Sequence, residues 1–402
     1  MFAITEKATQ KRTKLHNKRL VLKVIYDQGP MSRADIARAT HLARTTVSNV
    51  VASLMSEGLV EEVGQRLLER GKPATMLRVV ADSRQIIGLD LGGRIFRGVV
   101  SDLRGNIVHR QDVPLVGQQG EDALHQVYQL IDALSAKASQ PLLGIGVGVP
   151  GLVDVEKGCV RQSGRLDWWE LPLREYLSAR YHLPIHIAND SHVAAFGEYT
   201  FGNGRDAANL VVMTVGMGVS AGVVLNGQLH FGDSFGAGEI GHIRVVTGPE
   251  AKLCLCGNTG CLETVVNEAA LVEQAQEIAR SNPHSLLHQF IDDVNDTLDI
   301  ETVWQAFNAG DDELHGVVSQ MGQRLGYAVA AIGGILNVER IVVSGSLARF
   351  GTALLEAMQQ ELRASLHPML ADRTQIKLSS LGADIVMKGT IAMVLSAETG
   401  LV

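Results

Sequence analysis

The chain has 402 residues, of which 46 % are hydrophobic and 20 % charged, with a formal net charge of -7. No apolar run approaches the roughly 20 residues that span a bilayer, which excludes membrane insertion and favours a cytoplasmic protein. The charge is unevenly divided, because residues 1–80 hold 14 Lys and Arg against 7 Asp and Glu, while the rest holds 22 against 36. We therefore expect contact with a polyanion to be confined to the first 80 residues.

These basic residues begin with two predicted helices. Residues 15–28 have helical spacing of apolar side chains, and Gly29-Pro30 ends that helix. Ser32 is an expected N-cap with Asp35 in the capping-box position, which opens a short helix through Ala39. This arrangement is typical of the start of a helix-turn-helix.

A third helix, expected over residues 43–57, carries side chains suited to reading DNA. Val47, Val50 and Leu54 form its apolar face, and the opposite face carries short polar side chains and one guanidinium. Side chains of these types contact base edges in a major groove. The residues of this helix that we expect to contact DNA are Arg44, Thr45, Thr46, Ser48 and Asn49.

Strands at 59–63 and 76–80 are expected to pair as a wing after the third helix. The tip of this wing carries Arg70 and Lys72, which can reach phosphates or a minor groove. A small helical docking domain with a solvated basic face is the alternative for this region. The three helix lengths and the charge division favour a winged helix-turn-helix that binds double-stranded operator DNA.

Three of the four cysteines follow one histidine at close spacing. His242, Cys254, Cys256 and Cys261 supply three thiolates and one imidazole, the ligand set of a closed tetrahedral zinc site. Because the protein would fill all four positions, none remains for a reactive water, and the zinc is expected to be structural. A disulfide cluster is the alternative, but no secretory signal is recognisable and Cys159 would stand alone far upstream.

Beyond residue 80 the pattern changes to alternating strands and helices. A strand meander over 86–113 is followed by a helix over 121–138 and an apolar strand over 143–149. A second round begins with strands over 210–225, and long helices and a further strand are expected over 311–344. Continuous apolar strands between helices indicate an α/β fold with sheets buried on both faces, in two related lobes separated by a cleft.

Four motifs of this region resemble those of the ROK family of repressors and sugar kinases. They are residues 238–242 (Gly-Glu-Ile-Gly-His), the block 254–263, residues 149–154 (Val-Pro-Gly-Leu-Val-Asp) and residues 188–190 (Ala-Asn-Asp). The Gly-His and Cys-x-Cys-Gly-x-x-Gly-Cys-x-Glu block is highly specific, whereas Asp-x-Gly-Gly alone is weak. With the basic head included, the whole chain is similar to the ROK transcriptional repressors. The resemblance implies an actin-like body that holds a sugar between its lobes and dimerises.

The resemblance also implies a set of sugar-binding residues. Matched motif by motif, they are Gly151, Asn189, Asp190, Glu239, His242 and Glu263. Carboxylates and an amide offer the donors and acceptors that a polyhydroxylated ring needs. Support of the metal loop is a second role open to Glu239 and Glu263. Trp168 and Trp169 either stack on a sugar face or pack at a lobe boundary, and packing is the better supported.

Asp190 makes kinase activity the second hypothesis, since the matching residue in the family's kinases takes the proton from the sugar hydroxyl. The phosphate-side loops depart from the kinase pattern. Residues 90–94 lack the Thr of Asp-x-Gly-Gly-Thr, residues 216–218 read Gly-Met-Gly rather than Gly-Thr-Gly, and residues 344–346 read Ser-Gly-Ser rather than Gly-Gly-Gly. ATP is therefore not expected to bind. Arg94 either fills the vacated space, pairs with a phosphate or stays solvated.

We expect three parts in the chain: a winged helix-turn-helix over 1–80, a first lobe over 81–190 completed by 385–402, and a second lobe over 191–384 with the zinc loop and dimerisation helices. The predicted function is a sugar-responsive repressor of carbohydrate-metabolism genes, not an enzyme, that acts as a homodimer or tetramer. The alternatives are an ATP-dependent sugar kinase with a DNA-binding head and a scaffold controlled by a protein partner such as a sugar-transport component.

Overall fold

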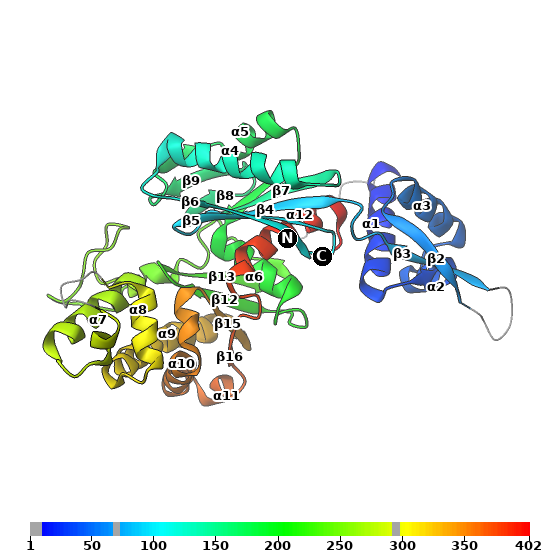
Figure 1. Cartoon of the computed structure of the whole chain (residues 1–402). Helices are drawn as coiled ribbons and strands as arrows, with labels where there is room; N and C mark the ends of the chain where they lie inside the picture. The colour runs from blue at the N-terminus through cyan, green and yellow to red at the C-terminus, as the bar shows by residue number, and fades with distance from the viewer. Residues whose placement is uncertain (1–9, 67–72, 292–297) are drawn as a thin grey trace.

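Figure 1 shows a small head joined to a two-lobed body. The computed structural model describes residues 10–66, 73–291 and 298–402 of the chain. The head, in blue, lies against one side of the first lobe, and the second lobe lies beneath the first. None of the helices in these ranges has the length and apolar character that crossing a membrane requires.

Three helices and a three-stranded sheet form the head, which confirms the predicted winged helix-turn-helix. Ser32 Oγ accepts a hydrogen bond from the Asp35 backbone N–H, and the Asp35 carboxylate accepts one from the Ser32 N–H, so the predicted capping box is present. The sheet order is β1-β3-β2, and β1 is too short for periodicity to reveal. The elements are α1 (Gln10–Gln28), β1 (Met31–Ser32), α2 (Arg33–Thr40), α3 (Arg44–Ser56), β2 (Val60–Arg66) and β3 (Ala74–Val79).

The first lobe contains a five-stranded sheet in the order β11-β7-β4-β5-β6. Strand β4 pairs antiparallel with β5 and parallel with β7, and β7 pairs parallel with β11. The carboxyl ends of β4, β7 and β11 therefore meet at one edge of the sheet, where α/β proteins place ligands. Its elements are β4 (Gln85–Asp90), β5 (Ile95–Ser101), β6 (Ile107–Pro114), α4 (Gly120–Lys137), β7 (Leu142–Val149), α5 (Leu173–Tyr181) and β11 (Ile185–Asn189). Strands β8 (Leu152–Asp154), β9 (Cys159–Ser163) and β10 (Trp168–Leu171) form a separate antiparallel sheet.

The second lobe repeats this strand order. Its sheet runs β14-β13-β12-β15-β16, with β12 antiparallel to β13 and parallel to β15. In both sheets three antiparallel strands are followed by two parallel ones, so the prediction of two related lobes is confirmed. The strands are β12 (Leu210–Val215), β13 (Val219–Leu225), β14 (Gln228–Leu229), β15 (Arg340–Ser344) and β16 (Gln375–Leu378). The helices are α7 (Glu268–Ser281), α8 (Ile300–Asn308), α9 (Asp312–Leu336), α10 (Gly351–Ser365) and α11 (Pro368–Ala371), with short 3-10 helices η1 (Ile240–His242), η2 (Leu262–Thr264), η3 (Leu286–Gln289), η4 (Ser346–Phe350) and η5 (Gly382–Asp384).

Two helices lie between the sheets of the lobes (Figure 1): α6 (Asp190–Phe201) and α12 (Ile385–Thr399). They approach so closely that a Cβ on Gly389 of α12 would lie 1.7 Å from the carbonyl oxygen of Val193 in α6. Only glycine allows this contact, because any side chain would force the helices apart. The end of the chain is thus fixed to the helix that begins at Asp190.

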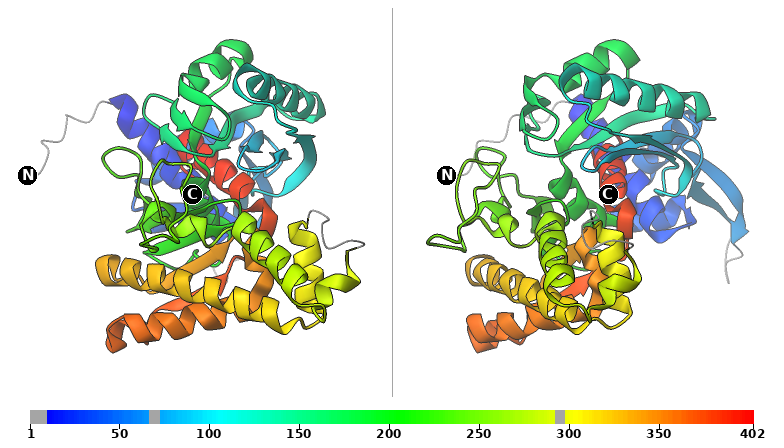
Figure 2. Two further views of the ribbon diagram at one scale, coloured as in Figure 1. Left: turned by 90° about the vertical axis from the view of Figure 1, so that its left-hand side faces the viewer. Right: turned by 60° about the vertical axis from the view of Figure 1, so that its left-hand side comes forward.

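The head shares its hydrophobic core with the first lobe. Val21 and Ile25 of α1 belong to the same buried cluster as Leu395 and Leu401 at the end of the chain and Ile86 of β4. Figures 1 and 2 show α1 beside the C-terminal helix α12. A shared core resists independent movement of the head, because separating the surfaces would expose apolar area to water.

Polar contacts add to this shared core. The Arg19 guanidinium donates to the carbonyl of Ala397 at 2.5 Å, and the Lys23 ammonium donates to that of Leu401 at 3.1 Å. These contacts join residues 378 positions apart in the chain.

Candidate functional site

The four predicted metal ligands come together in the structure. The ligand atoms of His242, Cys254, Cys256 and Cys261 all lie within 4.8 Å of one another. Cys256 Sγ is 3.7 Å from Cys261 Sγ, and Cys254 Sγ is 3.5 Å from His242 Nδ1. Thiolates bound at about 2.3 Å to a tetrahedral ion lie about 3.8 Å apart, so the set fits a metal ion. All four cysteines are free thiols, and the Sγ separation is too long for a disulfide.

Two carboxylates lie on either side of the His242 imidazole. Glu263 Oε1 accepts a hydrogen bond from Cys254 Sγ at 2.9 Å and lies 3.5 Å from His242 Nδ1. Glu239 Oε2 lies 3.6 Å from the other imidazole nitrogen, Nε2. Burial raises the pKa of Glu239, with the Glu263 charge adding to the increase. The His242 imidazole thus lies between the cysteine sulfurs and the Glu239 carboxylate.

Asn189 and Gly151 hold the edge where β7 and β11 end. Asn189 Oδ1 caps α6 by accepting hydrogen bonds from the backbone N–H groups of Ser191 and His192. Its Nδ2 donates to the carbonyl of Gly151 at 2.8 Å. This pair fixes the first turn of α6, so the next residue, Asp190, has a defined position at the start of the helix.

Asp190 lies against the turn that follows β4. A Cβ on Gly92 would lie 2.7 Å from Asp190 Oδ2, so this glycine is what admits the carboxyl. Burial, and then the charges of Asp90 and Glu239, raise the pKa of Asp190 to about 7, although hydrogen bonds from Ser191 oppose the shift. At neutral pH both forms are populated, and the ionised form can accept a hydrogen bond from a sugar hydroxyl.

Protein contacts join the loops at residues 216–218 and 344–346, which were compared above with the phosphate loops of the family's kinases. Ser346 Oγ donates a hydrogen bond to Glu268 Oε1, and the Glu268 backbone N–H donates to the carbonyl of Gly216 at 2.9 Å. The Glu268 carboxylate therefore lies between these two loops. Arg94 is exposed, so it does not fill this space.

The sequence did not predict a role for Arg165, which contacts the turn after β4 and the turn between β12 and β13. Its guanidinium donates to the carbonyl of Gly92 at 2.7 Å and lies 2.9 Å from Met217 Sδ. Nothing but its place in a tight turn between two short strands signals it in the sequence. Of the two tryptophans near it, Trp168 is 3 % exposed and donates to the Gly120 carbonyl, while Trp169 is 60 % exposed.

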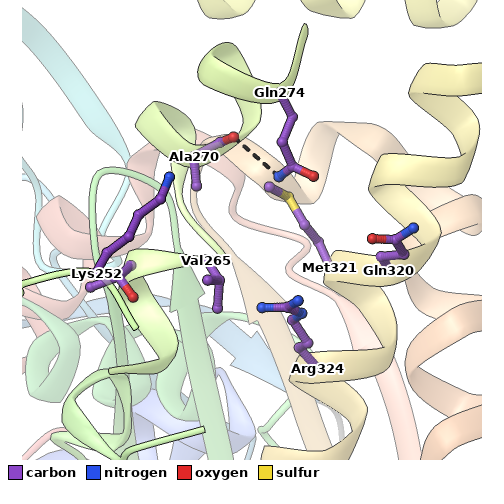
Figure 3. A pocket seen from close by; sticks show the side chains of 8 residues that line it. Lys252, Val265, Ala270, Gln274, Gln320, Met321 and Arg324 are labelled. Atoms are coloured by element: carbon purple, nitrogen blue, oxygen red, sulfur yellow. Dashed lines mark hydrogen bonds between the residues drawn. The ribbon is translucent and has the colours of Figure 1, made fainter. Parts of the chain in front are cut away.

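A separate cavity lies behind the metal loop. It has a volume of about 120 Å³ and lies between the loop and helices α7 and α9 (Figure 3). Lys252, Gln274 and Arg324 contribute polar groups to its wall, and Gln274 donates a hydrogen bond to the Ala270 carbonyl. None of the six expected sugar-binding residues lines it, so it is distinct from the expected sugar site.

Helix α3 lies on the side of the head away from the body (Figure 1), and its exposed face is polar. Val47, Val51 and Leu54 are fully buried, whereas Val50, expected on the apolar face, is half-buried. Of the expected DNA contacts, four are exposed and one is half-buried: Arg44, Thr45, Ser48 and Asn49 are exposed, and Thr46 is half-buried. Arg70 and Lys72 lie outside the described residues.

A winged helix-turn-helix on a two-lobed actin-like body, with a His and Cys cluster that could hold a metal ion, defines a protein of the sugar-kinase-like class with a DNA-binding head. Residues 86–397 match the ROK family, and residues 17–67 match the MarR family. The chain therefore belongs to the ROK family.

Three relatives show how far the similarity extends. The xylose repressor of Caldicellulosiruptor bescii is 30 % identical, over 94 % of this chain and 95 % of its own length. The glucokinase of Halalkalibacterium halodurans is 33 % identical, over 75 % of this chain and 92 % of its own. The solved structure of a ROK-family transcriptional regulator, a homolog of the Escherichia coli MLC protein, has a TM-score of 0.82 at 26 % identity and covers 96 % of this chain and 97 % of its own.

Proposed function

We propose that the protein is a sugar-responsive, DNA-binding transcriptional repressor of carbohydrate-metabolism genes. One observation carries this proposal. The exposed polar face of α3 belongs to a head that shares one hydrophobic core with the first lobe. The similarity to a xylose repressor along nearly the whole chain supports it. We assign operator contacts to Arg44, Thr45, Thr46, Ser48, Asn49, Arg70 and Lys72.

The effector in this proposal is a monosaccharide in the cleft between the lobes. The residues assigned to it are Gly151, Asn189, Asp190, Glu239, His242 and Glu263. Asp190 and Glu239 contribute acceptors for the hydroxyl groups of the sugar. A sugar of the wrong configuration would leave these carboxylates without hydrogen-bond partners, which lowers its affinity. His242 contacts the sugar through Nε2 while Nδ1 faces the thiolates.

We assign structural zinc to His242, Cys254, Cys256 and Cys261. Three thiolates and one imidazole suit this ion, and the protein supplies all four ligands. Burial, with a contribution from Glu263, raises the pKa of the Cys254 thiol, so without a metal the thiol form is favoured. A bound zinc ion supplies the positive charge that stabilises the thiolate and fixes the loop that presents Glu263.

The route from sugar to DNA runs through α6 and α12. Asp190 is the first residue of α6, α6 packs against α12 at Gly389, and the end of α12 shares a core with α1. A shift of α6 on sugar binding would therefore move α12 and, through the shared core, the head. A hundredfold change in operator affinity needs about 2.7 kcal/mol of coupling, which two or three hydrogen bonds that differ between states supply.

We propose a cytoplasmic homodimer that assembles through the second lobe. Tyr327 and Ile335 of α9 and Met369 of α11 are exposed at 57 %, 81 % and 73 %, and such apolar side chains favour contact with a second copy. Two-fold symmetry then matches a pseudo-palindromic operator. The parts of the chain in this proposal are 1–80, 81–190 with 385–402, and 191–384.

One observation favours a kinase as the second candidate. The pKa of Asp190, raised to about 7, suits a general base for a sugar hydroxyl. Against this, the carboxylate of Glu268 lies between the nucleotide-side loops and would repel a polyphosphate. A coupled assay with ATP, Mg²⁺ and a panel of aldoses separates the two, because turnover that Asp190→Asn abolishes makes the protein an enzyme.

Binding of labelled operator DNA, selected from a random pool, tests the repressor. We expect fluorescence anisotropy to show salt-sensitive binding that a monosaccharide changes in the parent protein and not in Asp190→Asn. Operator binding that no sugar alters, together with sugar phosphorylation, would establish the kinase instead.

A further inference from the structure

The cavity behind the metal loop (residues 242–265) has a positively charged wall. It forms where this loop meets α7 and α9, and its volume is about 120 Å³ (Figure 3). Of the eight described residues that line it, Lys252 and Arg324 are cations and none is Asp or Glu. Residues 81–402 hold 36 Asp and Glu against 22 Lys and Arg, so this wall has the opposite charge to the body around it.

Arg324 reaches the cavity without a partner for its charge. Within the described parts of the chain, its guanidinium makes no hydrogen bond and has no carboxylate oxygen within 4.0 Å. In Figure 3 the guanidinium extends from α9 toward Val265 of the metal loop. Gln320 lies one turn before Arg324 on the same face of α9 and also lines the cavity. The five N–H donors of the guanidinium therefore remain available to a ligand.

Lys252 approaches the cavity from the metal loop. Its ammonium pairs with the Glu273 carboxylate, and the two side chains are 50 % and 64 % exposed. Water screens such an exposed ion pair, so it holds the ammonium only weakly. An ammonium has three donors, so Lys252 can keep this partner and still donate to a ligand.

Two other carboxylates of the surrounding elements have partners elsewhere. The Glu263 carboxylate, next to Thr264, accepts a hydrogen bond from Cys254 Sγ at 2.9 Å. On α10, which packs against α9, the Glu361 carboxylate accepts one from Ser365 Oγ. The charged side chains that line the cavity are therefore both positive, with Glu273 beside one of them.

We propose that this cavity binds a small oxyanion, with Arg324 and Lys252 as its charge partners. An engineered protein cavity of roughly 150 Å³ accepts benzene, so 120 Å³ has room for about five or six non-hydrogen atoms. Inorganic phosphate and short carboxylates have this size, and the planar guanidinium matches two of their oxygens. The inference goes beyond the proposed function, because none of the expected sugar-binding residues lines this cavity.

An anion in the cavity joins the metal loop to α9. Thr264 lines the cavity, and its hydroxyl donates to the carbonyl of Cys261 at 2.7 Å. The ligand thus contacts the loop beside one of the four clustered His and Cys side chains. Because the cavity exists only in the folded chain, the anion also stabilises the fold in proportion to its occupancy.

A competing role for Arg324 is an ion pair with a carboxylate of a second copy of the chain. Tyr327, three residues further along α9, is 57 % exposed and belongs to the proposed dimer surface. An ion pair between copies changes the dimer dissociation constant and needs no added anion. Anion binding changes neither property, so the two roles can be separated.

Isothermal titration calorimetry on the full chain at constant ionic strength tests the proposal. The probes are phosphate, sulfate, acetate and lactate, with acetamide and lactamide as neutral analogues of the two carboxylates. We expect at least one anion to bind at one site per chain with a dissociation constant of about 1 mM or tighter, and the amides not to bind. Tighter binding of phosphate and sulfate, or of acetate and lactate, identifies the class of anion.

Variants of two arginines locate the bound anion. Arg324→Gln should weaken binding about ten- to a hundredfold, the size expected for a charge-assisted hydrogen bond, and Arg324→Lys should restore part of the affinity. Arg280→Gln is the matched control, because Arg280 is an exposed residue of α7 that does not line the cavity. This control should bind the anion as the parent does.

Three results would overturn the inference and leave the proposed function intact. One is the absence of saturable binding for every anion in the parent protein. Another is binding that Arg324→Gln leaves unchanged, or that Arg280→Gln weakens to the same extent. The third is an Arg324→Gln protein that dissociates into monomers in analytical ultracentrifugation while the parent binds no anion, which establishes the ion pair between copies.

Discussion

Replacing Asp190 by Asn should stabilise the folded protein at alkaline pH while it removes the sugar response. The pKa of Asp190 is about 7 in the folded chain, against about 3.9 for an unfolded Asp. Since the folded form holds the proton more tightly, the resulting stability is full below the unfolded pKa and is lost as pH rises toward about 7. Three pKa units correspond to about 4 kcal/mol. We reduce this to about 2 kcal/mol because Asp190 is only half-buried and water screens its carboxylate.

Asn has no proton to lose, so the difference between variant and parent should widen with pH. About half of the 2 kcal/mol falls between pH 5.5 and 8, which gives an expected change near 1 kcal/mol in the free energy of unfolding. Urea denaturation of both proteins at these two pH values measures it. A difference that stays constant, or that shrinks as pH rises, would refute the raised pKa of the Asp190 carboxyl.

Asp311→Asn is the matched control with the opposite sign. Burial acts to raise the pKa of Asp311, but hydrogen bonds from Ser285 and from the backbone N–H groups of Leu314 and Leu286 hold it below its usual value. Its ionised form therefore stabilises the fold above the unfolded pKa, and this stability is lost in acid. We expect the control to be destabilised by about 1 to 3 kcal/mol at pH 8.

Three further predictions concern the head, the metal, and the contact between the head and the first lobe. Arg44→Ala should weaken operator binding about ten- to a hundredfold in anisotropy measurements, and undiminished affinity would remove Arg44 from the recognition surface. Removing zinc with a chelator, or Cys261→Ser, should lower the melting temperature and abolish sugar binding, as calorimetry and elemental analysis will show. Arg104→Ala removes a guanidinium 3.9 Å from the Tyr26 ring and a hydrogen bond to the Tyr26 carbonyl, so operator binding should become less responsive to sugar while sugar affinity stays the same.

Features coded by neighbouring residues could be predicted from the sequence. The Ser32 and Asp35 capping box needs only three residues of spacing, and its hydrogen bonds are present. The ligand set between His242 and Cys261 also lies in one short stretch, and the structure brings the four side chains together. The elements β4 to β7, α4, β12, β13, α9 and β15 could be predicted because their apolar runs are long and regular, whereas β8 to β11, α5 to α8 and α10 to α12 were not predicted.

Features that depend on distant contacts could not be predicted in this way. The pairing of α1 with the end of α12 joins residues 378 positions apart, and no local pattern encodes it. Arg165 has no periodic or motif signal, and its importance depends on two turns that come from different lobes. The raised pKa of Asp190 likewise depends first on burial and then on the charges of Asp90 and Glu239, which only the folded chain brings about.

The same contacts explain why a kinase-like cleft suits a sensor. A kinase must admit a polyphosphate between its loops, but here the Glu268 carboxylate and the Arg165 guanidinium lie there instead. In the proposed repressor sugar binding is not followed by phosphoryl transfer, so its free energy would remain available to shift α6 against α12. Because α12 ends in the core of the head, that shift acts on the surface that carries Arg44. The coupling is limited to the difference in sugar affinity between the two arrangements, and a difference of about 2.7 kcal/mol changes operator affinity a hundredfold.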